Sequence, residues 1–246
     1  MAAQKTRATA PTFRHLMHTI SGISAATGTL GRMRNVGRSA CAVAVVLTFF
    51  TSPELSACGF CPPTTECRTE HDERGKNAFC AQRQGTQWRH HGPFRAWYEN
   101  DHPAAQGNFF AGEKHGLFRM WYHNGAPMSH GGYAHNRRIG TWMSWHPDGR
   151  PFIRANFVDD DEEGPWVSWW EEGHKSAEGS FHQGWEHGRW TFWYPQGPRS
   201  AEGAYLHGKR EGWWNRWDSD GRHVALILYH DGVEISGAQV WQQPPP

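Results

Sequence analysis

Six tryptophans recur at intervals of 24 residues, and their rings are the side chains of this chain best suited to bind a ligand. An indole ring can stack on a sugar, hold a quaternary ammonium group by a cation–π contact, or pack inside a hydrophobic core. We expect most of these rings to be structural, because a single-layer sheet has few other side chains to bury. Binding of a carbohydrate or of choline is the alternative. The six residues are Trp97, Trp121, Trp145, Trp169, Trp193 and Trp217.

Metal-binding and catalytic patterns are weak or missing in the sequence. The histidines form no column: His115 and His187 share one repeat position, and His135 and His207 share another, where other units carry Ile, Glu, Asp or Gln. The acidic run from Asp159 to Glu163 lacks the alternation and the glycine of a calcium loop, which indicates a solvated turn. No nucleophile elbow, phosphate loop or pair of catalytic carboxylates stands out. We therefore expect no catalytic residue, no metal, no cofactor and no enzymatic activity.

Residues 1–57 are expected to be an upstream segment and a signal peptide. Arg34 and Arg38 precede an apolar run of 11 residues, Ala40–Phe50, which is too short to span a bilayer permanently. This is the pattern of an exported protein, and Met33 is a second candidate start.

Leu55-Ser56-Ala57-Cys58 ends this segment and resembles the lipobox of bacterial lipoproteins. The resemblance implies that Cys58 is acylated, becomes the mature N-terminus and anchors the chain stably in a membrane. Gly59 at the next position implies that this membrane is the outer membrane. Two alternatives remain open: two disulfides in an oxidising compartment, with three pairings, or a zinc site. Both use the same four cysteines: Cys58, Cys61, Cys67 and Cys80.

Composition favours sheet and argues against a nucleic-acid binder. The 28 glycines and 15 tryptophans suit turns and pleated strands. Only Glu54 among the acidic residues precedes Cys58, so the rest of the chain holds 19 basic and 23 acidic residues, a net charge of −4. A general binder of nucleic acid or anionic lipid would carry a basic stripe. Residues 58–91 are expected to form a cysteine-containing tether, and residues 237–246 a proline-rich tail.

Self-similarity over residues 92–236 predicts the architecture. Six glycines spaced by 24 residues begin the units, and we number positions in a unit from this glycine as position 0. An aromatic residue occupies position 2, tryptophan position 5, glycine position 9 in five units, and Phe or Tyr position 17. The glycines at position 0 are Gly92, Gly116, Gly140, Gly164, Gly188 and Gly212.

Each unit is predicted to be a β-hairpin, and the six units an all-β, elongated antiparallel meander of about twelve strands. Pairs such as Asn124-Gly125 are typical of tight hairpin turns, and Gly112–Gly116 has the G-x-x-x-G form of a second turn. If the first turn has two residues, position 2 faces position 15, where a glycine is covered by the ring. If the second turn is equally tight, position 17 faces position 2 of the next unit. Tryptophan at position 5 has the opposite parity, so either a bulge swings it to the aromatic face or a second face carries a row of tryptophans.

The pattern Gly-x-[Phe/Trp]-x-x-Trp resembles the bacterial variant of the MORN (membrane occupation and recognition nexus) repeat. Residues 112–125, GEKHGLFRMWYHNG, and 208–214, GKREGWW, carry the likeness. It implies a stack of β-hairpins used as a scaffold that binds protein partners or membranes, and bacterial members are often labelled antitoxin-like. We therefore expect a non-catalytic scaffold, anchored in the cell envelope, that binds a protein or an envelope component along its aromatic sheet. A cell-wall carbohydrate or choline-binding module, and an antitoxin-like partner of a toxin, are the alternatives.

Overall fold

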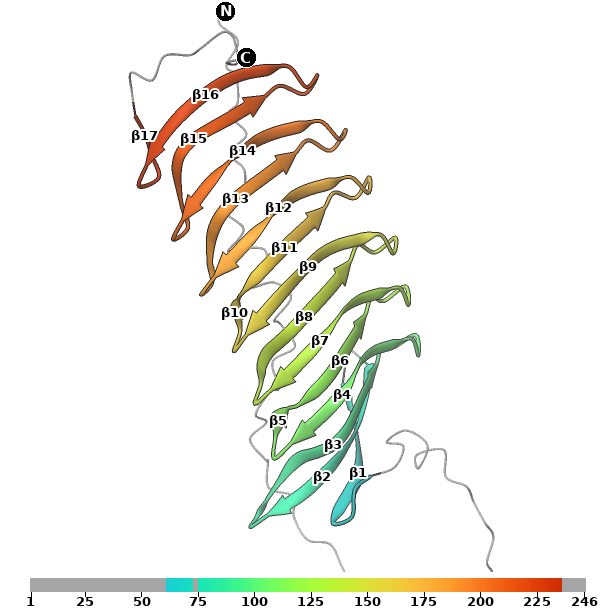
Figure 1. Ribbon diagram of the computed structural model, residues 1–246. Coiled ribbons are helices and arrows are strands. Elements are labelled where there is room, and N and C mark those ends of the chain that lie inside the picture. Colours follow the sequence, from blue (N-terminus) through green and yellow to red (C-terminus); the bar gives the residue numbers. More distant parts are fainter. Residues whose placement is uncertain (1–60, 73–74, 236–246) are drawn as a thin grey trace, which may run out of the picture. The chain divides into compact units, whose positions relative to one another are not determined.

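The computed structural model describes residues 61–72 and 75–235, which form one antiparallel sheet of 17 strands (Figure 1). Strands that follow one another in the chain pair with each other, except that β5 and β6 both pair with β4 and β10 and β11 both pair with β9, so the sheet is an open meander. No helix occurs in these residues, and hence none long and apolar enough to cross a membrane. The predicted signal peptide, Cys58 and the proline-rich tail lie outside the described residues.

The strands, in chain order, are β1 (Thr65–Asp72), β2 (Gly75–Gln84), β3 (Gln87–Trp97), β4 (Pro103–Phe110), β5 (Glu113–Lys114), β6 (Gly116–Trp121), β7 (Pro127–Ala134), β8 (Arg137–Trp145), β9 (Pro151–Val158), β10 (Asp161–Glu162), β11 (Gly164–Trp169), β12 (Lys175–His182), β13 (Trp185–Trp193), β14 (Arg199–Leu206), β15 (Lys209–Trp217), β16 (His223–His230) and β17 (Val233–Glu234).

The all-β meander with twelve repeat strands is confirmed. β5 with β6, and β10 with β11, are the two parts of single repeat strands interrupted at His115 and Glu163. Counted this way, β3 to β16 are the twelve strands of the six units, and β1, β2 and β17 are added at the two ends of the sheet.

Within the expected tether, Thr65–Asp72 and Gly75–Gln84 are strands of the sheet. β1 and β2 pair along their whole length, and β2 pairs with β3 of the first repeat. The sequence of β1 is almost wholly polar, so the aromatic periodicity of the chain gives no sign of this strand. A disulfide joins Cys61 to Cys80, with 5.6 Å between their Cα atoms, and Cys67 is also disulfide-bonded. These bonds exclude the four-cysteine zinc site.

The first turn of each unit has three residues rather than the expected two. In the second unit the Gly125 amide donates to the Tyr122 carbonyl at 2.8 Å, and Gly125 takes a φ of 85°. Trp121 then pairs with Pro127 while the preceding Met120 pairs with Ser129, so one residue bulges beside the tryptophan. The bulge restores the register that a two-residue loop would produce, and position 2 therefore faces position 15 as predicted.

The second turn lies at positions 19 and 20 and does not extend over the whole G-x-x-x-G segment. Ala134 pairs with Arg137, and the two residues between them have positive φ, 50° at His135 and 65° at Asn136. Positive φ at both central residues defines a type I′ turn, which matches the twist of paired strands. The glycine at position 0 lies beyond this turn, inside the next strand.

That glycine forms a bulge in the strand. His130 pairs with Met143 and Gly132 with Ile139, so three residues beginning at Gly140 lie opposite a single residue of β7. Glycines at position 0 have φ between 65° and 104°, positive values that glycine adopts at no steric cost. The bulge swings the position 2 ring of each strand back over the strand before it.

Rings at positions 2 and 17 fill one side of the sheet, which we call the first face. The ring of Trp142 lies on Gly131 so closely that a Cβ there would overlap it, and Trp142 contacts Tyr133 edge-on with 5.0 Å between centroids. The ring predicted to cover the glycine at position 15 therefore comes from the following unit, not from the strand that pairs with this glycine in its own hairpin. The indole nitrogen donates to the Gly132 carbonyl at 3.1 Å, which satisfies this buried donor. Phe118, Trp142, Trp166, Trp190 and Trp214 are all buried.

Two rows of hydrogen bonds join successive units at the turns, which Figure 1 places along the two long edges of the sheet. At the second turns, a backbone amide such as Gly208 donates to the carbonyl of Glu186, 22 residues earlier, at 3.0 Å. At the first turns, the side chain at position 6 reaches the tryptophan carbonyl of the next unit, as Tyr122 does to Trp145 at 2.7 Å. Tyr98, His146, Trp170 and Tyr194 make the equivalent contact.

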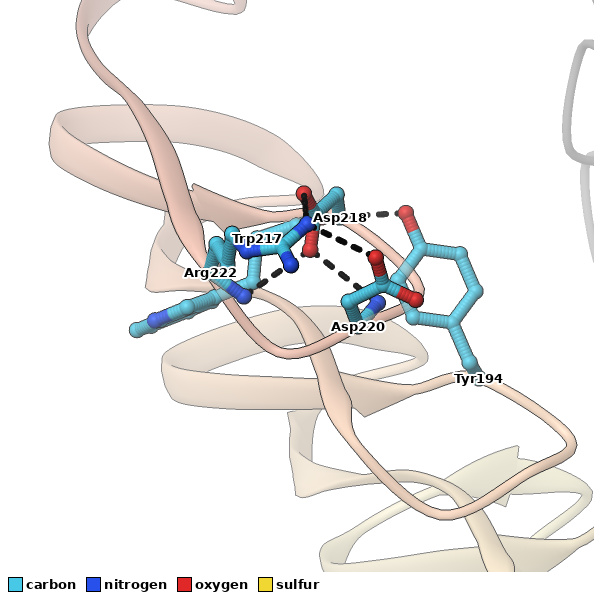
Figure 2. Close-up of polar contacts among 5 residues, drawn as sticks. All are labelled: Tyr194, Trp217, Asp218, Asp220 and Arg222. Atoms are coloured by element: carbon cyan, nitrogen blue, oxygen red, sulfur yellow. Dashed lines mark hydrogen bonds and ion pairs between the residues drawn. The ribbon is translucent and has the colours of Figure 1, made fainter.

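Figure 2 shows the last member of the first-turn row. The Tyr194 hydroxyl donates to the Trp217 carbonyl at 3.0 Å. Position 6 of the final unit is Asp218, and its carboxylate accepts the backbone amides of Asp220 and Arg222 instead of reaching outward. The row therefore ends where no seventh repeat hairpin follows among the described residues.

Loss of a first-face ring should destabilise the sheet far more than loss of a tryptophan at position 5. Trp190 is 3% exposed and Trp193 is half-buried. We expect Trp190→Ala to lower the free energy of unfolding by about 3–5 kcal/mol, and Trp193→Ala by less than half of that amount. Equilibrium denaturation followed by circular dichroism measures both, and equal losses would contradict this assignment of the buried face.

Removal of one first-turn hydrogen bond should have a smaller and local cost. Tyr194→Phe keeps the ring but leaves the Trp217 carbonyl without this donor, and we expect a loss of about 1 kcal/mol. Tyr133→Phe is the matched control, because the Tyr133 hydroxyl makes no hydrogen bond among the described residues. The same denaturation assay compares the two, and a cost at Tyr133 as large as at Tyr194 would count against the row.

Candidate functional site

The six tryptophans at position 5 lie on the side of the sheet opposite the buried rings, which we call the second face. Phe79 pairs with Phe94 of the first face, whereas its neighbours Ala78 and Cys80 lie on the other side, where Trp97 packs against them. The bulge beside each tryptophan is on the partner strand, so the alternation along its own strand is undisturbed. Of the two arrangements left open by the sequence, the second face with a tryptophan row is the observed one.

All six rings of this tryptophan row are half-buried. Successive members are two strands apart, which corresponds to about 10 Å across the sheet. The residue paired with each tryptophan separates it from the next: proline in the first three units, then Lys175, Arg199 and His223. The Trp145 ring contacts His130, with 5.1 Å between centroids. The rings are thus held at regular intervals by small or cationic neighbours.

Two residues before the tryptophans, side chains at positions 3 and 14 form a parallel row across the same face. In the first three units this row carries Arg95, Arg119 and Arg154, which we call the arginine row. Arg119 and Arg154 are exposed, and Arg95 is half-buried. Among the ion pairs of the described residues none involves these three guanidinium groups. The first half of the second face therefore holds uncompensated positive charge.

In the fourth and fifth units the same row carries carboxylates that are already paired, and in the sixth unit it carries Asn215 and Leu226. Glu178 forms an ion pair with Lys175 at 2.6 Å. Glu202 is 8% exposed and is bound by Arg189 and Arg199. The arginine row is thus basic and unpaired over its first half, whereas the carboxylates that follow in the same row are bound by cations of this chain.

The arginine row was not predicted from the sequence, because its members do not share one repeat position. Arg95 and Arg119 occupy position 3, whereas Arg154 occupies position 14 of the third unit. The pairing of Arg119 with Gln106 and His130, and of Arg154 with Met143, brings these positions into one line. The signal that could have identified them is the alternation of side chains along a strand. Residues an even number of positions from a tryptophan, and the residues paired with them, lie on the same face as that tryptophan.

The first face offers less to a ligand than the second. Its rings are buried against one another, and three cations lie over them: Lys114 is 5.0 Å from the Tyr133 centroid, Arg138 3.9 Å from Phe157, and Arg210 4.6 Å from Trp214. Burial lowers the pKa of Lys114 and raises that of Tyr133. We conclude that this side is the hydrophobic core of the sheet.

The histidines and the acidic run also have structural contacts. Asp159 and Asp160 are the central residues of a type I′ turn, and they pair with Arg137 and Arg138 respectively. Within residues 61–72 and 75–235 no group of three or more His, Cys, Asp or Glu side chains is placed to hold a metal ion. Several histidines pair singly with glutamates, as His230 does with Glu211 at 2.9 Å.

No protein-family model matches the chain, and no curated protein is significantly similar to it. The relation to MORN repeats therefore stays a prediction. The tryptophan row and the arginine row are the features of the described residues that point most directly to a function.

The His230–Glu211 pair predicts a pH dependence at the second-turn edge. The hydrogen bond to Glu211 and its charge raise the pKa of His230 above 6.5, and the same bond lowers the pKa of Glu211 below 4.5. The contribution of His230 is fully present below pH 6.5 and is lost as pH rises through its raised pKa. The contribution of Glu211 is present above pH 4.5 and is lost as pH falls through its lowered pKa. The pair therefore stabilises most between these limits.

An NMR titration of the His230 ring tests this directly. We expect Glu211→Gln to return the pKa of His230 towards 6.5, while Glu234→Gln, a change at an exposed acid on the neighbouring β17, leaves it raised. An unchanged pKa in Glu211→Gln would show that the contact does not form in solution.

Proposed function

We propose that this chain is a non-catalytic binding scaffold of the cell envelope and that it binds its partner on the second face. The observation that carries the proposal is the row of six half-buried tryptophans, which lies on the side of the sheet not used as the core. Exposed apolar residues that share a face with polar ones are typical of interaction sites. Leu117 and Trp213, at position 1 on the same face, are 45% and 48% exposed.

Several features support the absence of a catalytic step as part of this proposal. The ionisable side chains of the second face are spread along rows; in its second half Glu178 and Glu202 are each engaged by a Lys or Arg, and Glu211 is engaged by His230. Acid–base catalysis requires groups that converge on one reacting atom. A surface that repeats every 24 residues instead suits recognition of an extended partner.

Location in the envelope rests on the export pattern of residues 33–58 and on cysteine chemistry. The Cys61–Cys80 disulfide is of a kind that persists in oxidising compartments. An acylated Cys58 would place the sheet at a membrane surface, because Cys58 precedes the first repeat glycine by only about 30 residues. Mass spectrometry of the mature N-terminus would identify the cleavage site and any acyl group together.

The binding role predicts that the purified mature chain sediments with washed bacterial envelopes. We expect Trp121→Ala combined with Trp145→Ala to weaken this binding at least tenfold, because two adjacent rings of the tryptophan row are removed. His207→Asn, at an exposed second turn, is the control and should bind as the parent does. Circular dichroism and thermal melts establish that each variant is folded. Equal binding by a folded double variant would overturn the second face as the binding site.

A further inference from the structure

We infer that the first half of the second face binds a linear polysaccharide that carries one carboxylate in each disaccharide. This inference rests on the proposed function and names the chemistry of its ligand. It starts from two parallel rows on one face, the tryptophans of the first three units and the arginine row. Arg95 and Arg119 lie two residues before a tryptophan of their own strand, and Arg154 is paired with Met143, two residues before Trp145.

The spacing of the two rows favours a ligand with widely separated charges. Trp97, Trp121 and Trp145 follow one another at about 10 Å, since each step crosses two strands. Arg95 and Arg119 are also two strands apart, and Arg154 lies three strands beyond Arg119, or about 14 Å. The two sugars of a disaccharide in an extended 1,4-linked polysaccharide cover about the same length as one step of the tryptophan row. One ring and about one guanidinium group are thus available for each disaccharide.

The side-chain chemistry matches this ligand at both rows. An indole ring offers an apolar face to the C–H groups of a sugar ring, and its half-buried setting holds it at low entropic cost. A guanidinium group binds a carboxylate through two parallel hydrogen bonds. Because Arg119 and Arg154 are exposed and have no ion pair among the described residues, a carboxylate of the ligand displaces no internal partner.

Other extended partners fit the surface less well. A peptide that binds by strand addition is recognised through backbone hydrogen bonds at a sheet edge, and a sheet face has none to offer. A nucleic acid strand carries a phosphate about every 3.4 Å along its helix axis, and single strands are bound by continuous basic grooves. Here the cations are separated by two or three strands, and His130 and Met143 lie between them.

The second half of the same face does not offer unpaired arginines of this row to the carboxylates of a polysaccharide. Glu178 and Glu202 replace arginines in the row and are already bound to cations of this chain. The guanidinium groups of the row that have no ion pair among the described residues therefore lie in the first three units, where we place the polymer.

Isothermal titration calorimetry with the purified mature chain tests the inference. The probes are a hyaluronan decasaccharide, with one carboxylate per disaccharide, a neutral chitin oligosaccharide, and single-stranded oligo-dT. We expect the hyaluronan probe to bind most tightly and to weaken as salt is raised, because the arginines are exposed. Arg119→Gln combined with Arg154→Gln should reduce its affinity at least tenfold. Arg216→Gln removes an exposed arginine at position 4, which faces the other side of the sheet, and should change nothing.

Each contrary outcome has a defined meaning. Binding of oligo-dT or of the neutral chitin probe as tight as that of hyaluronan would overturn the carboxylate-bearing ligand, as would unchanged affinity in the folded Arg119→Gln, Arg154→Gln variant. If hyaluronan does not bind but envelopes still sediment the chain through Trp121 and Trp145, this inference fails and the proposed function stands. If neither probe nor envelope binds, both fail.

Discussion

The fold depends on the contact between a ring and a glycine in the strand before it. Trp190 lies on Gly179 and Trp214 on Gly203 so closely that a side chain at either glycine would overlap the indole. A single sheet has no second layer against which to bury its apolar side, so the rings are buried by the sheet itself. This is possible only because position 15 lacks a Cβ and the bulge at position 0 tilts the following ring back over it. The third unit has Ala155 at this position, and there Trp166 contacts Trp190 and Phe181 instead.

Much of this could be predicted from residue types and spacing, because the contacts are local and repeat. The X-Gly pairs predicted the hairpins, and the register of Phe118 with Gly131 followed from them. The position 0 bulge was hidden, since Gly112 and Gly116 together have the form of one turn. Asn136 and Asp160, which adopt positive φ without being glycine, show that the turn itself is only two residues long. β1 could not be predicted because it carries no aromatic residue and depends on the neighbouring strand and the disulfides.

The candidate site was predictable in part. The tryptophan row was evident as a column, but its face was not, since a bulge on the tryptophan's own strand would have moved it to the first face. The bulge falls on the partner strand, and this single detail separates the tryptophans from the core. The arginine row required the full register of six strands before Arg95, Arg119 and Arg154 came into line. Features that repeat in every unit are thus visible in the sequence as columns, while the arginine row breaks the columns and becomes visible only in the folded sheet.

The links between units also make the array extensible. The turn amides reach back 22 residues, as Gly232 does to Arg210, and the position 6 side chains reach forward 23, as Tyr194 does to Trp217. Because these separations are constant, excising any 24-residue segment from the middle of the array would bring an equivalent donor opposite an equivalent acceptor. Duplication would do the same. Unequal recombination in the gene can therefore lengthen or shorten the sheet in steps of one hairpin, because each added unit makes the same contacts with its neighbours as the existing units do.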